Sequence, residues 1–310
     1  MELTLEKSLL EKASALESQI GNTPLWPIEN LHKNPRVKLY AKVEWEQLSG
    51  SIKARAAFAI IKKAIQNGSL EEGRTLLDAT SGNTGIAYAS IAKALGLNVT
   101  LCLPENASKK RREILQDLGA DILYTSRFGG TDEAQQVAKQ LADAHPEKYF
   151  YANQYANHQN WLAHYHTTGA EIINELPNIT HFVAGLGTTG TFVGTGRRLR
   201  AFNTSIQLIA LQPDSPLHGL EGWKHLETAD IPEIFDPVIA NQTLEVSSTA
   251  AYDLIKRFYD ENGVLLSPSS AANLAGALAV ADTLKEGTIV IVFPDDAHKY
   301  SEITSKILAP

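Results

Sequence analysis

The chain has 310 residues, of which 44% are hydrophobic and 20% charged, and its formal net charge is −7. The length suggests about two domains or one large α/β unit, and the composition is typical of a globular protein. The negative balance argues against binding to nucleic acid or a membrane surface. The single cysteine, Cys102, excludes a disulfide framework and fits a cytoplasmic protein. No run of about 18 apolar residues predicts a membrane span.

Strand-like and helix-like patterns then alternate along the chain. The N-terminal MELTLEKSLLEKASALES predicts a short amphipathic helix rather than a signal peptide. Apolar, β-branched runs predict strands at 37–43, 75–79, 99–103, 122–124, 150–152, 181–184, 206–211, 264–266 and 288–293. Helical periodicity predicts helices at 53–66, 86–95, 109–118, 133–144, 169–175, 249–261 and 272–284. Because parallel strands need helical crossovers, this alternation predicts an α/β protein with doubly wound, mostly parallel sheets.

Three local features receive simple interpretations. Cys102 lies in an apolar run and is interpreted as a small buried hydrophobe. The basic clusters 109–112 and 197–198 lie on predicted helices and are interpreted as solvated faces. Residues 212–244 form the longest irregular stretch, which we expect to border a functional site because long irregular segments in compact domains are often functional.

Ligands of open α/β sheets bind beyond the carboxyl ends of strands, so strand-to-helix turns are the informative places. In the first such turn, Ser51 is a predicted N-cap and Lys53 falls in the first helical turn. A helix N-terminus disfavours a cation, which helps to keep an amine neutral and nucleophilic, as a Schiff-base lysine requires. A solvated surface lysine is the simpler interpretation of this segment alone.

Two further turns have the composition of anion sites. Residues 80–85, Thr-Ser-Gly-Asn-Thr-Gly, place hydroxyls, an amide and two glycines at a helix N-terminus, which suits a carboxylate. Residues 185–191, Gly-Leu-Gly-Thr-Thr-Gly-Thr, suit a phosphate and also match the dinucleotide pattern G-x-G-x-x-G. The acidic residue expected about 20 positions later is displaced to Asp214, behind a proline, so a phosphate site is favoured over a dinucleotide loop.

A fourth turn, Ser267-Pro268-Ser269-Ser270, is by itself an ordinary N-cap. The histidines at 158, 164 and 166 lack the acidic or cysteine partners of a metal site, and none is predicted. Neither a Walker A motif nor a G-x-S-x-G elbow is present in the sequence.

Together these turns resemble the cysteine synthase family, the O-acetylserine or O-phosphoserine sulfhydrylases of fold type II pyridoxal-phosphate enzymes. The resemblance runs from Gly-Asn-Thr-Pro-Leu at 21–25 to Pro-Asp-Asp at 294–296. The segments SGSIKAR, TSGNTG, GLGTTGT and PSS occur in the family's order and spacing, which is far more specific than any one of them.

The resemblance implies a role for individual residues. Lys53 matches the lysine that carries the cofactor as a Schiff base, Asn83 the asparagine at its ring hydroxyl, and Ser269 the serine facing its pyridine nitrogen. The 5′-phosphate loop corresponds to Gly187, Thr188, Thr189, Gly190 and Thr191. The substrate-binding positions correspond to Thr80, Ser81, Gly82, Thr84, Gln154 and Gly222.

The family fold implies two domains of the tryptophan synthase β type. Residues 45–155 would form a smaller mobile domain with the carboxylate loop, and residues 1–44 plus 156–310 a larger domain that binds the cofactor phosphate. The implied partners are an amino-acid substrate and sulfide, a second copy of the chain in a homodimer, and a serine acetyltransferase tail or a sulfur-carrier protein.

The implied reaction is β-replacement, in which an activated serine loses its leaving group through an α-aminoacrylate and sulfide adds to give L-cysteine. Because no arginine for a substrate phosphate is found in 218–226, O-acetylserine is favoured over O-phosphoserine. The alternatives are a cystathionine β-synthase-like enzyme and an enzyme that releases H₂S from cysteine. A non-catalytic binding protein and a nucleotide-dependent dehydrogenase are less favoured.

Overall fold

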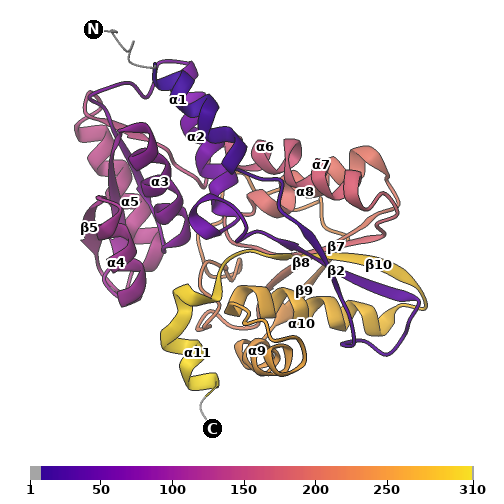
Figure 1. The fold of residues 1–310 in the computed structure, drawn as a ribbon. Helices are drawn as coiled ribbons and strands as arrows, with labels where there is room; N and C mark the ends of the chain where they lie inside the picture. Colours follow the sequence, from indigo (N-terminus) through magenta and orange to yellow (C-terminus); the bar gives the residue numbers. More distant parts are fainter. Residues whose placement is uncertain (1–7, 309–310) are drawn as a thin grey trace, which may run out of the picture.

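The computed structural model describes residues 8–308, which form two sheets flanked by helices (Figure 1). The larger sheet has the spatial order β1-β2-β10-β7-β8-β9, and only the β1–β2 pair is antiparallel. Its strands are β1 Leu25–Ile28, β2 Val37–Val43, β7 His181–Gly185, β8 Gln207–Pro213, β9 Gln242–Val246 and β10 Gly287–Phe293. The smaller sheet is fully parallel, in the order β5-β4-β3-β6. Its strands are β3 Thr75–Ala79, β4 Asn98–Pro104, β5 Asp121–Thr125 and β6 Tyr149–Tyr151.

Helices cover both faces of the larger sheet, as Figure 1 shows. On one side lie α6 His158–His166, α7 Thr168–Glu175 and α8 Gly190–Phe202, and on the other α9 Ser248–Asn262 and α10 Pro268–Thr283. The smaller sheet packs with α3 Asn83–Leu95, α4 Lys109–Asp117 and α5 Gly130–Ala144. The remaining helical segments are α1 Leu9–Leu16, α2 Lys53–Gln66, α11 Ser301–Ile307 and the short η1 Glu17–Gln19, η2 Leu48–Gly50 and η3 Ala297–Tyr300.

The continuous apolar run of β10 is explained by burial on both faces of the sheet. Ile289, Ile291 and Phe293 pack into the cluster that includes α9 and α10, whereas Val290 and Val292 pack into the cluster under α7 and α8. Because successive side chains of a strand point to opposite faces, a strand covered on both faces reads as a nearly continuous apolar run. The predicted α/β fold with mostly parallel sheets is confirmed.

Several predicted elements differ from the observed ones. Residues 264–266 form no strand, and Leu266 makes only an isolated bridge to Asp296. Strands β1 and β9 and helix α6 were not predicted. Helices α3 and α10 begin earlier than expected, because residues assigned to the turns form their first helical turn. The N-terminal helix is present at Leu9–Leu16, and the part of that prediction over residues 1–7 lies outside the described residues.

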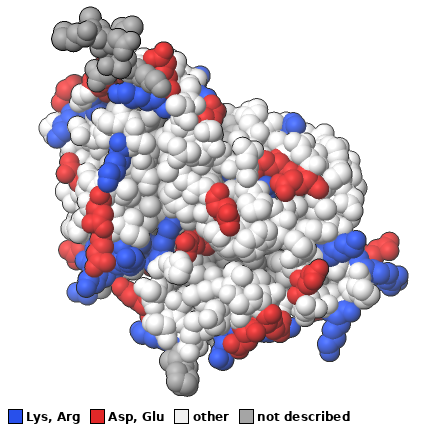
Figure 2. Space-filling view, in the orientation of Figure 1, with Lys and Arg blue, Asp and Glu red and all other residues white. Residues whose placement is uncertain are grey.

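Charged side chains of both signs are scattered over the face shown in Figure 2, and some acidic side chains lie among the uncharged residues of its centre. No continuous stripe of Lys and Arg, of the kind that follows a phosphate backbone, crosses that face. Among residues 8–308, no helix is long and apolar enough to span a membrane.

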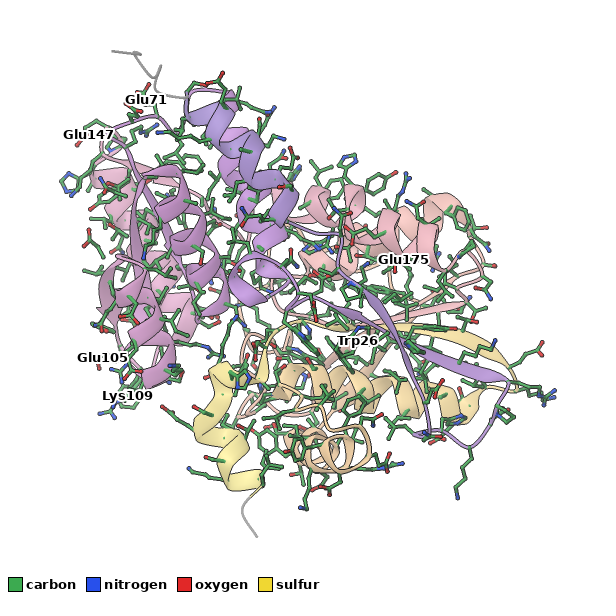
Figure 3. The ribbon with its side chains drawn as sticks, viewed as in Figure 1. Trp26, Glu71, Glu105, Lys109, Glu147 and Glu175 are labelled. Atoms are coloured by element: carbon green, nitrogen blue, oxygen red, sulfur yellow. The ribbon has the colours of Figure 1, made fainter. Side chains whose placement is uncertain are left out.

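A buried ion network fixes the helix that carries Lys53. Arg55 on α2 is buried and pairs with Glu44 at 2.7 Å and with Glu171 on α7 at 2.6 Å. Lys42 on β2, also buried, pairs with Glu171 at 3.0 Å and with Glu175 at 2.7 Å (Figure 3). Each charge therefore has an opposite charge in contact, which is the condition under which buried charges are tolerated.

Replacement of Glu171 by Gln is expected to lower the free energy of unfolding at pH 7 by about 2–3 kcal/mol, because hydrogen bonds from two buried cations lose a charged acceptor. Burial would raise the pKa of Glu171, but Arg55 and Lys42 lower it to about 2 from its usual 4.5. The carboxylate therefore stabilises the fold fully above pH 4.5 and loses that effect as the pH falls toward 2. Urea unfolding at pH 7 and pH 3 measures both effects.

Glu71→Gln is the matched control, because Glu71 is exposed and lies well away from Glu175 of the network (Figure 3). Equal stabilities of the two variants at pH 7 would contradict the account of the network.

Candidate active site

A cavity opens where the carboxyl ends of β3, β6, β7 and β10 approach one another. Most of the predicted site residues line it, namely Lys53, Ser81, Asn83, Thr84, Gln154, Gly187, Thr188, Thr191, Gly222 and Ser269. Thr80, Gly82, Thr189 and Gly190 belong to the same loops but do not line the cavity. The irregular segment 214–241 supplies Glu221, Gly222, Trp223 and Lys224, so the expectation that it borders the site is confirmed.

Lys53 is the first residue of α2. Removal of water lowers the pKa of its ammonium group, and the nearby Asp295 carboxylate opposes this shift. Both burial and the helix N-terminus thus favour the neutral, nucleophilic amine. The prediction that Ser51 is the N-cap is wrong, because Ile52 occupies that position and makes no side-chain cap. The Ser51 hydroxyl is instead buried without a hydrogen-bond partner among the described residues.

The loop 80–85 is shaped by one hydroxyl and one glycine. The Thr80 hydroxyl accepts hydrogen bonds from the backbone N–H of Gly82 at 2.9 Å and of Gly85 at 3.0 Å. Gly82 has a φ of +152°, a conformation that residues with a side chain rarely adopt. Ser81 and Thr84 of this turn line the cavity. Thr80 does not line it, and its hydroxyl instead holds the backbone of the turn.

Gln154 joins this loop to the end of β3. Its amide nitrogen donates to the Ala79 carbonyl at 2.8 Å, and its amide oxygen accepts from the Thr84 hydroxyl at 2.8 Å. The Gln154 backbone N–H donates to Asp78 at 3.2 Å. Burial raises the pKa of Asp78 to about 7, against the hydrogen bonds that lower it. The two elements predicted to bind a carboxylate are therefore brought together.

The loop 185–191 runs from β7 into α8 and approaches neighbouring backbone closely. A Cβ atom on Gly187 would lie 2.1 Å from the Gly222 carbonyl oxygen, and one on Gly190 would lie 2.0 Å from the Asn160 side-chain oxygen. Thr189 occupies the N-cap position with a φ of +70°, and its hydroxyl is buried without a partner among residues 8–308. The Asn160 amide donates to the Thr188 hydroxyl at 3.1 Å.

Ser269 lies in the first turn of α10 and donates to the Glu221 carbonyl at 3.2 Å. As predicted, this turn is capped by Ser267, whose hydroxyl accepts from the Ser270 N–H at 3.1 Å.

Asp295 was not predicted as a site residue. It follows β10, lines the cavity, and accepts from Asn83 at 2.7 Å, from Ser267 at 2.6 Å and from the Tyr300 hydroxyl. Its position beyond a strand's carboxyl end was the available signal.

Arg111 overturns the interpretation of 109–112 as a solvated face. Lys109, labelled in Figure 3, and Lys110 are exposed. Arg111 is buried, lines the cavity and pairs with Glu221. Its guanidinium lies 4.6 Å from the centre of the Tyr300 ring.

The 197–198 pair is also not simply solvated. The Arg197 guanidinium lies 4.5 Å from the centre of the Trp161 ring and pairs with Asp236 at 2.9 Å.

The donor set of the cavity fits an aromatic aldehyde that carries a phosphate. Lys53 offers an amine with a lowered pKa. The start of α8 offers helix N–H groups and the hydroxyls of Thr188 and Thr191, which suit a phosphate. Asn83 and Ser269 offer neutral polar groups at the same cavity. Cys102 contributes no nucleophile, because burial raises its pKa to about 11.

Comparison with known proteins agrees with this donor set. A family model described as pyridoxal-phosphate dependent enzyme matches residues 16–295. The chain belongs to the pyridoxal-phosphate dependent enzyme family. A cysteine synthase of Aquifex aeolicus (strain VF5) is 41% identical over 91% of this chain and 88% of its own. An O-acetylserine dependent cystathionine beta-synthase of Bacillus subtilis (strain 168) is 36% identical over 91% of this chain and 94% of its own.

Structural similarity leads to the same family. A hydrogen sulfide-producing enzyme of Fusobacterium nucleatum superposes with a TM-score of 0.87 at 31% identity, over 97% of this chain and 92% of the other. The pyridoxal-phosphate enzyme fold, of type II with two α/β domains, is thereby confirmed, as is the predicted cofactor. The G-x-G-x-x-G match at 185–190 belongs to a pyridoxal-phosphate enzyme and not to a dehydrogenase.

Proposed function

We propose that this enzyme makes L-cysteine by β-replacement, from O-acetylserine and sulfide. The observation that carries the proposal is a single cavity in which a lysine of lowered pKa, a phosphate-type loop and a carboxylate-type loop converge. The 41% identity to a cysteine synthase supports the same activity.

Each predicted residue has a proposed role in this reaction. Lys53 holds the cofactor, and its amine, once released, takes the proton from the substrate α-carbon. Thr188, Thr191 and the backbone between them hold the cofactor phosphate, with Gly187, Thr189 and Gly190 shaping that loop. Asn83 and Ser269 contact the cofactor ring, and Ser269 is neutral, so it cannot protonate the ring nitrogen as an acid would. When bound, pyridoxal phosphate supplies an electron sink for charge developing at the α-carbon.

The substrate carboxylate is proposed to bind at the N-terminus of α3. Ser81 and Thr84 line the cavity there, and Gln154 contacts Thr84 directly. Thr80 and Gly82 shape this loop, and Gly222 also lines the cavity. Helix N–H groups and hydroxyls recognise a carboxylate and place the rest of the amino acid toward Lys53.

The charges of the cavity favour acetate as the leaving group. Among the described lining residues, Arg111 is paired with Glu221, and Lys224 is paired with Asp132 at 2.5 Å. Lys53, the remaining lining cation, is assigned to the cofactor. A phosphate leaving group would have to displace one of these carboxylates, whereas a neutral acetyl ester would not.

The activity test supplies sulfide with either O-acetylserine or O-phosphoserine to the pyridoxal-phosphate-loaded enzyme and measures cysteine. We expect a kcat/KM for O-acetylserine at least tenfold higher. A preference for O-phosphoserine would contradict the leaving-group argument, and no cysteine from either would contradict the proposed reaction.

Gln154→Glu is expected to raise the KM for O-acetylserine roughly tenfold or more, because it places a negative charge beside the proposed carboxylate site. The cofactor affinity should change much less, because Gln154 contacts Thr84 and Ala79. Steady-state kinetics and cofactor titration separate the two effects. A weakened cofactor affinity with an unchanged KM would contradict the proposed role.

A second candidate function differs in the thiol that supplies the sulfur or in the amino-acid substrate. The Bacillus subtilis relative is named for cystathionine synthesis from O-acetylserine, and the Fusobacterium nucleatum structure for sulfide production. Both names favour testing homocysteine in place of sulfide, and cysteine in place of O-acetylserine. Homocysteine used more efficiently than sulfide would move the assignment to the first of these activities.

The domain boundaries and the assembly are also proposals. Strands β3 to β6 all fall within the proposed smaller domain, residues 45–155, although α2 packs against α6 as well as α3. Movement of this domain relative to residues 1–44 and 156–310 would close the cavity over the substrate. A homodimer in the cytoplasm, and docking of an acetyltransferase tail or a sulfur carrier, are proposed from the family resemblance.

A further inference from the structure

Lys299 is a buried lysine in η3 whose ammonium group reaches two loops of the site. It donates to the carbonyl oxygens of Ser49 and Gly50, each at 2.8 Å, and to the side-chain oxygen of Asn83 at 3.3 Å. A lysine ammonium has three N–H donors, so all three are used. Lys299 does not line the cavity, and none of the roles proposed above involves it.

The first of these loops has an unusual backbone immediately before Lys53. Ser49 and Gly50 both have positive φ values, +67° and +59°. This conformation is unfavourable for a residue with a side chain such as serine, and it persists where surrounding contacts hold it. The two carbonyl oxygens of this turn share the same ammonium group. Lys299 thus supplies a contact that holds the turn leading to Lys53.

The second loop is held through the Asn83 amide. Its nitrogen donates to Asp295 at 2.7 Å, and its oxygen accepts from Lys299. An anionic acceptor at one end and a cationic donor at the other define which way the amide faces. The Tyr300 hydroxyl is a further hydrogen-bond partner of the Asn83 side chain.

We propose that Lys299 is a positioning residue that links the Ser49–Gly50 turn to Asn83, and so fixes Lys53 and Asn83 relative to each other. This inference rests on the proposed roles of Lys53 and Asn83 in holding the cofactor. The link spans the loop before α2 and the start of α3, two segments that the chain joins only through α2 and β3. A single buried charge can therefore control the geometry of two cofactor contacts.

The charges around Lys299 make this link sensitive to pH. Burial lowers the pKa of its ammonium group to about 8, the carboxylates of Asp295 and Asp296 oppose the shift, and Arg111 on α4 adds to it. Burial also raises the pKa of the adjacent Tyr300, whose hydroxyl stays neutral. Lys299 is charged below about pH 8 and becomes neutral as the pH rises through that value, which weakens its hydrogen bonds to the three oxygens.

The test compares Lys299→Met and Lys299→Arg with Lys306→Met, an exposed lysine on α11 that serves as the matched control. Hydrogen exchange of residues 48–53 in the cofactor-free protein reports on the turn without any turnover. Titration with pyridoxal phosphate reports on cofactor affinity between pH 7 and pH 10. An arginine keeps its charge over this whole range.

In Lys299→Met we expect faster exchange confined to 48–53 and about tenfold weaker cofactor affinity at pH 7, which corresponds to the loss of a charged hydrogen bond. Lys299→Arg should restore most of the affinity and should lose less of it than the wild type between pH 7 and pH 10. Lys306→Met should match the wild type.

Unchanged exchange and affinity in Lys299→Met would overturn the proposal, and so would identical pH profiles for wild type and Lys299→Arg. If Lys299→Met does not fold, the pH comparison with Lys299→Arg still decides. A wild-type protein that forms no bond to pyridoxal phosphate would instead contradict the proposed function, and the exchange experiment would then still test the link itself.

Discussion

Lys53→Ala is expected to lower turnover of O-acetylserine by about 10³-fold or more, because one change removes both the cofactor attachment and the proposed proton acceptor. The wild-type amine lies at a cavity wall where burial already lowers its pKa. An alanine leaves the cofactor held by the phosphate loop and the proposed ring contacts, without a covalent attachment. Steady-state kinetics and the visible spectrum of the loaded protein measure the two losses separately.

Lys63→Ala is the matched control, because Lys63 lies on the same helix but is exposed. It should leave kcat and the spectrum unchanged. A Lys53→Ala variant that folds normally and retains more than about a tenth of the turnover would show that another group moves the proton.

Gly187→Ala is expected to weaken pyridoxal-phosphate binding at least tenfold and to lower the free energy of unfolding by about 1–3 kcal/mol. The added methyl group would lie 2.1 Å from the Gly222 carbonyl oxygen. Backbone cannot rotate away as a side chain can, so either the phosphate loop or the 221–224 segment must shift. Both line the cavity. Cofactor titration and urea unfolding test the two effects.

Gly196→Ala tests whether that effect is specific. Gly196 lies further along α8, and the nearest atoms to its added methyl would be the side-chain ends of Leu208 at 2.9 Å and Ile239 at 3.3 Å. Those side chains can adjust, and alanine favours a helix over glycine by roughly 1 kcal/mol. The cofactor affinity should therefore stay near the wild-type value. Equal losses in both variants would contradict the close-approach argument.

The central strands could be predicted from sequence because both of their faces are buried. The predicted bounds of β2 and β3 match the observed ones, and α2 was also predicted at 53–66. The two missed strands are edge strands. Pro27 interrupts β1, and most of β9 is exposed, so neither carries a continuous apolar signal.

Helix α6 escaped prediction for a different reason. Its sequence, HQNWLAHYH, has little amphipathic pattern, and it packs against α2 on one side and α8 on another. Tertiary contacts of this kind override a weak local preference. It supplies Asn160, which contacts both the Thr188 hydroxyl and the Gln154 carbonyl, at 2.7 Å for the latter.

The candidate site was predictable where a motif lies in one turn and not where partners meet across the chain. The turns at 80–85 and 185–191 each carry their own signal, whereas those at 53 and 267–270 gain meaning only from the ordered resemblance to the family. Arg111 and Glu221 are 110 positions apart, and nothing in either local sequence indicates their pairing. Lys299 and Ser49 are still further apart, at 250 positions. The roles of the individual residues stay predictions until they are measured.

The most direct measurement of the central claim is the visible absorbance of the purified, pyridoxal-phosphate-loaded protein before and after addition of O-acetylserine. The account predicts a band from the Lys53-bound cofactor that is absent in Lys53→Ala, shifts with O-acetylserine and returns when sulfide is added. A protein that develops no such band, or whose band is unchanged by both O-acetylserine and O-phosphoserine, would contradict it.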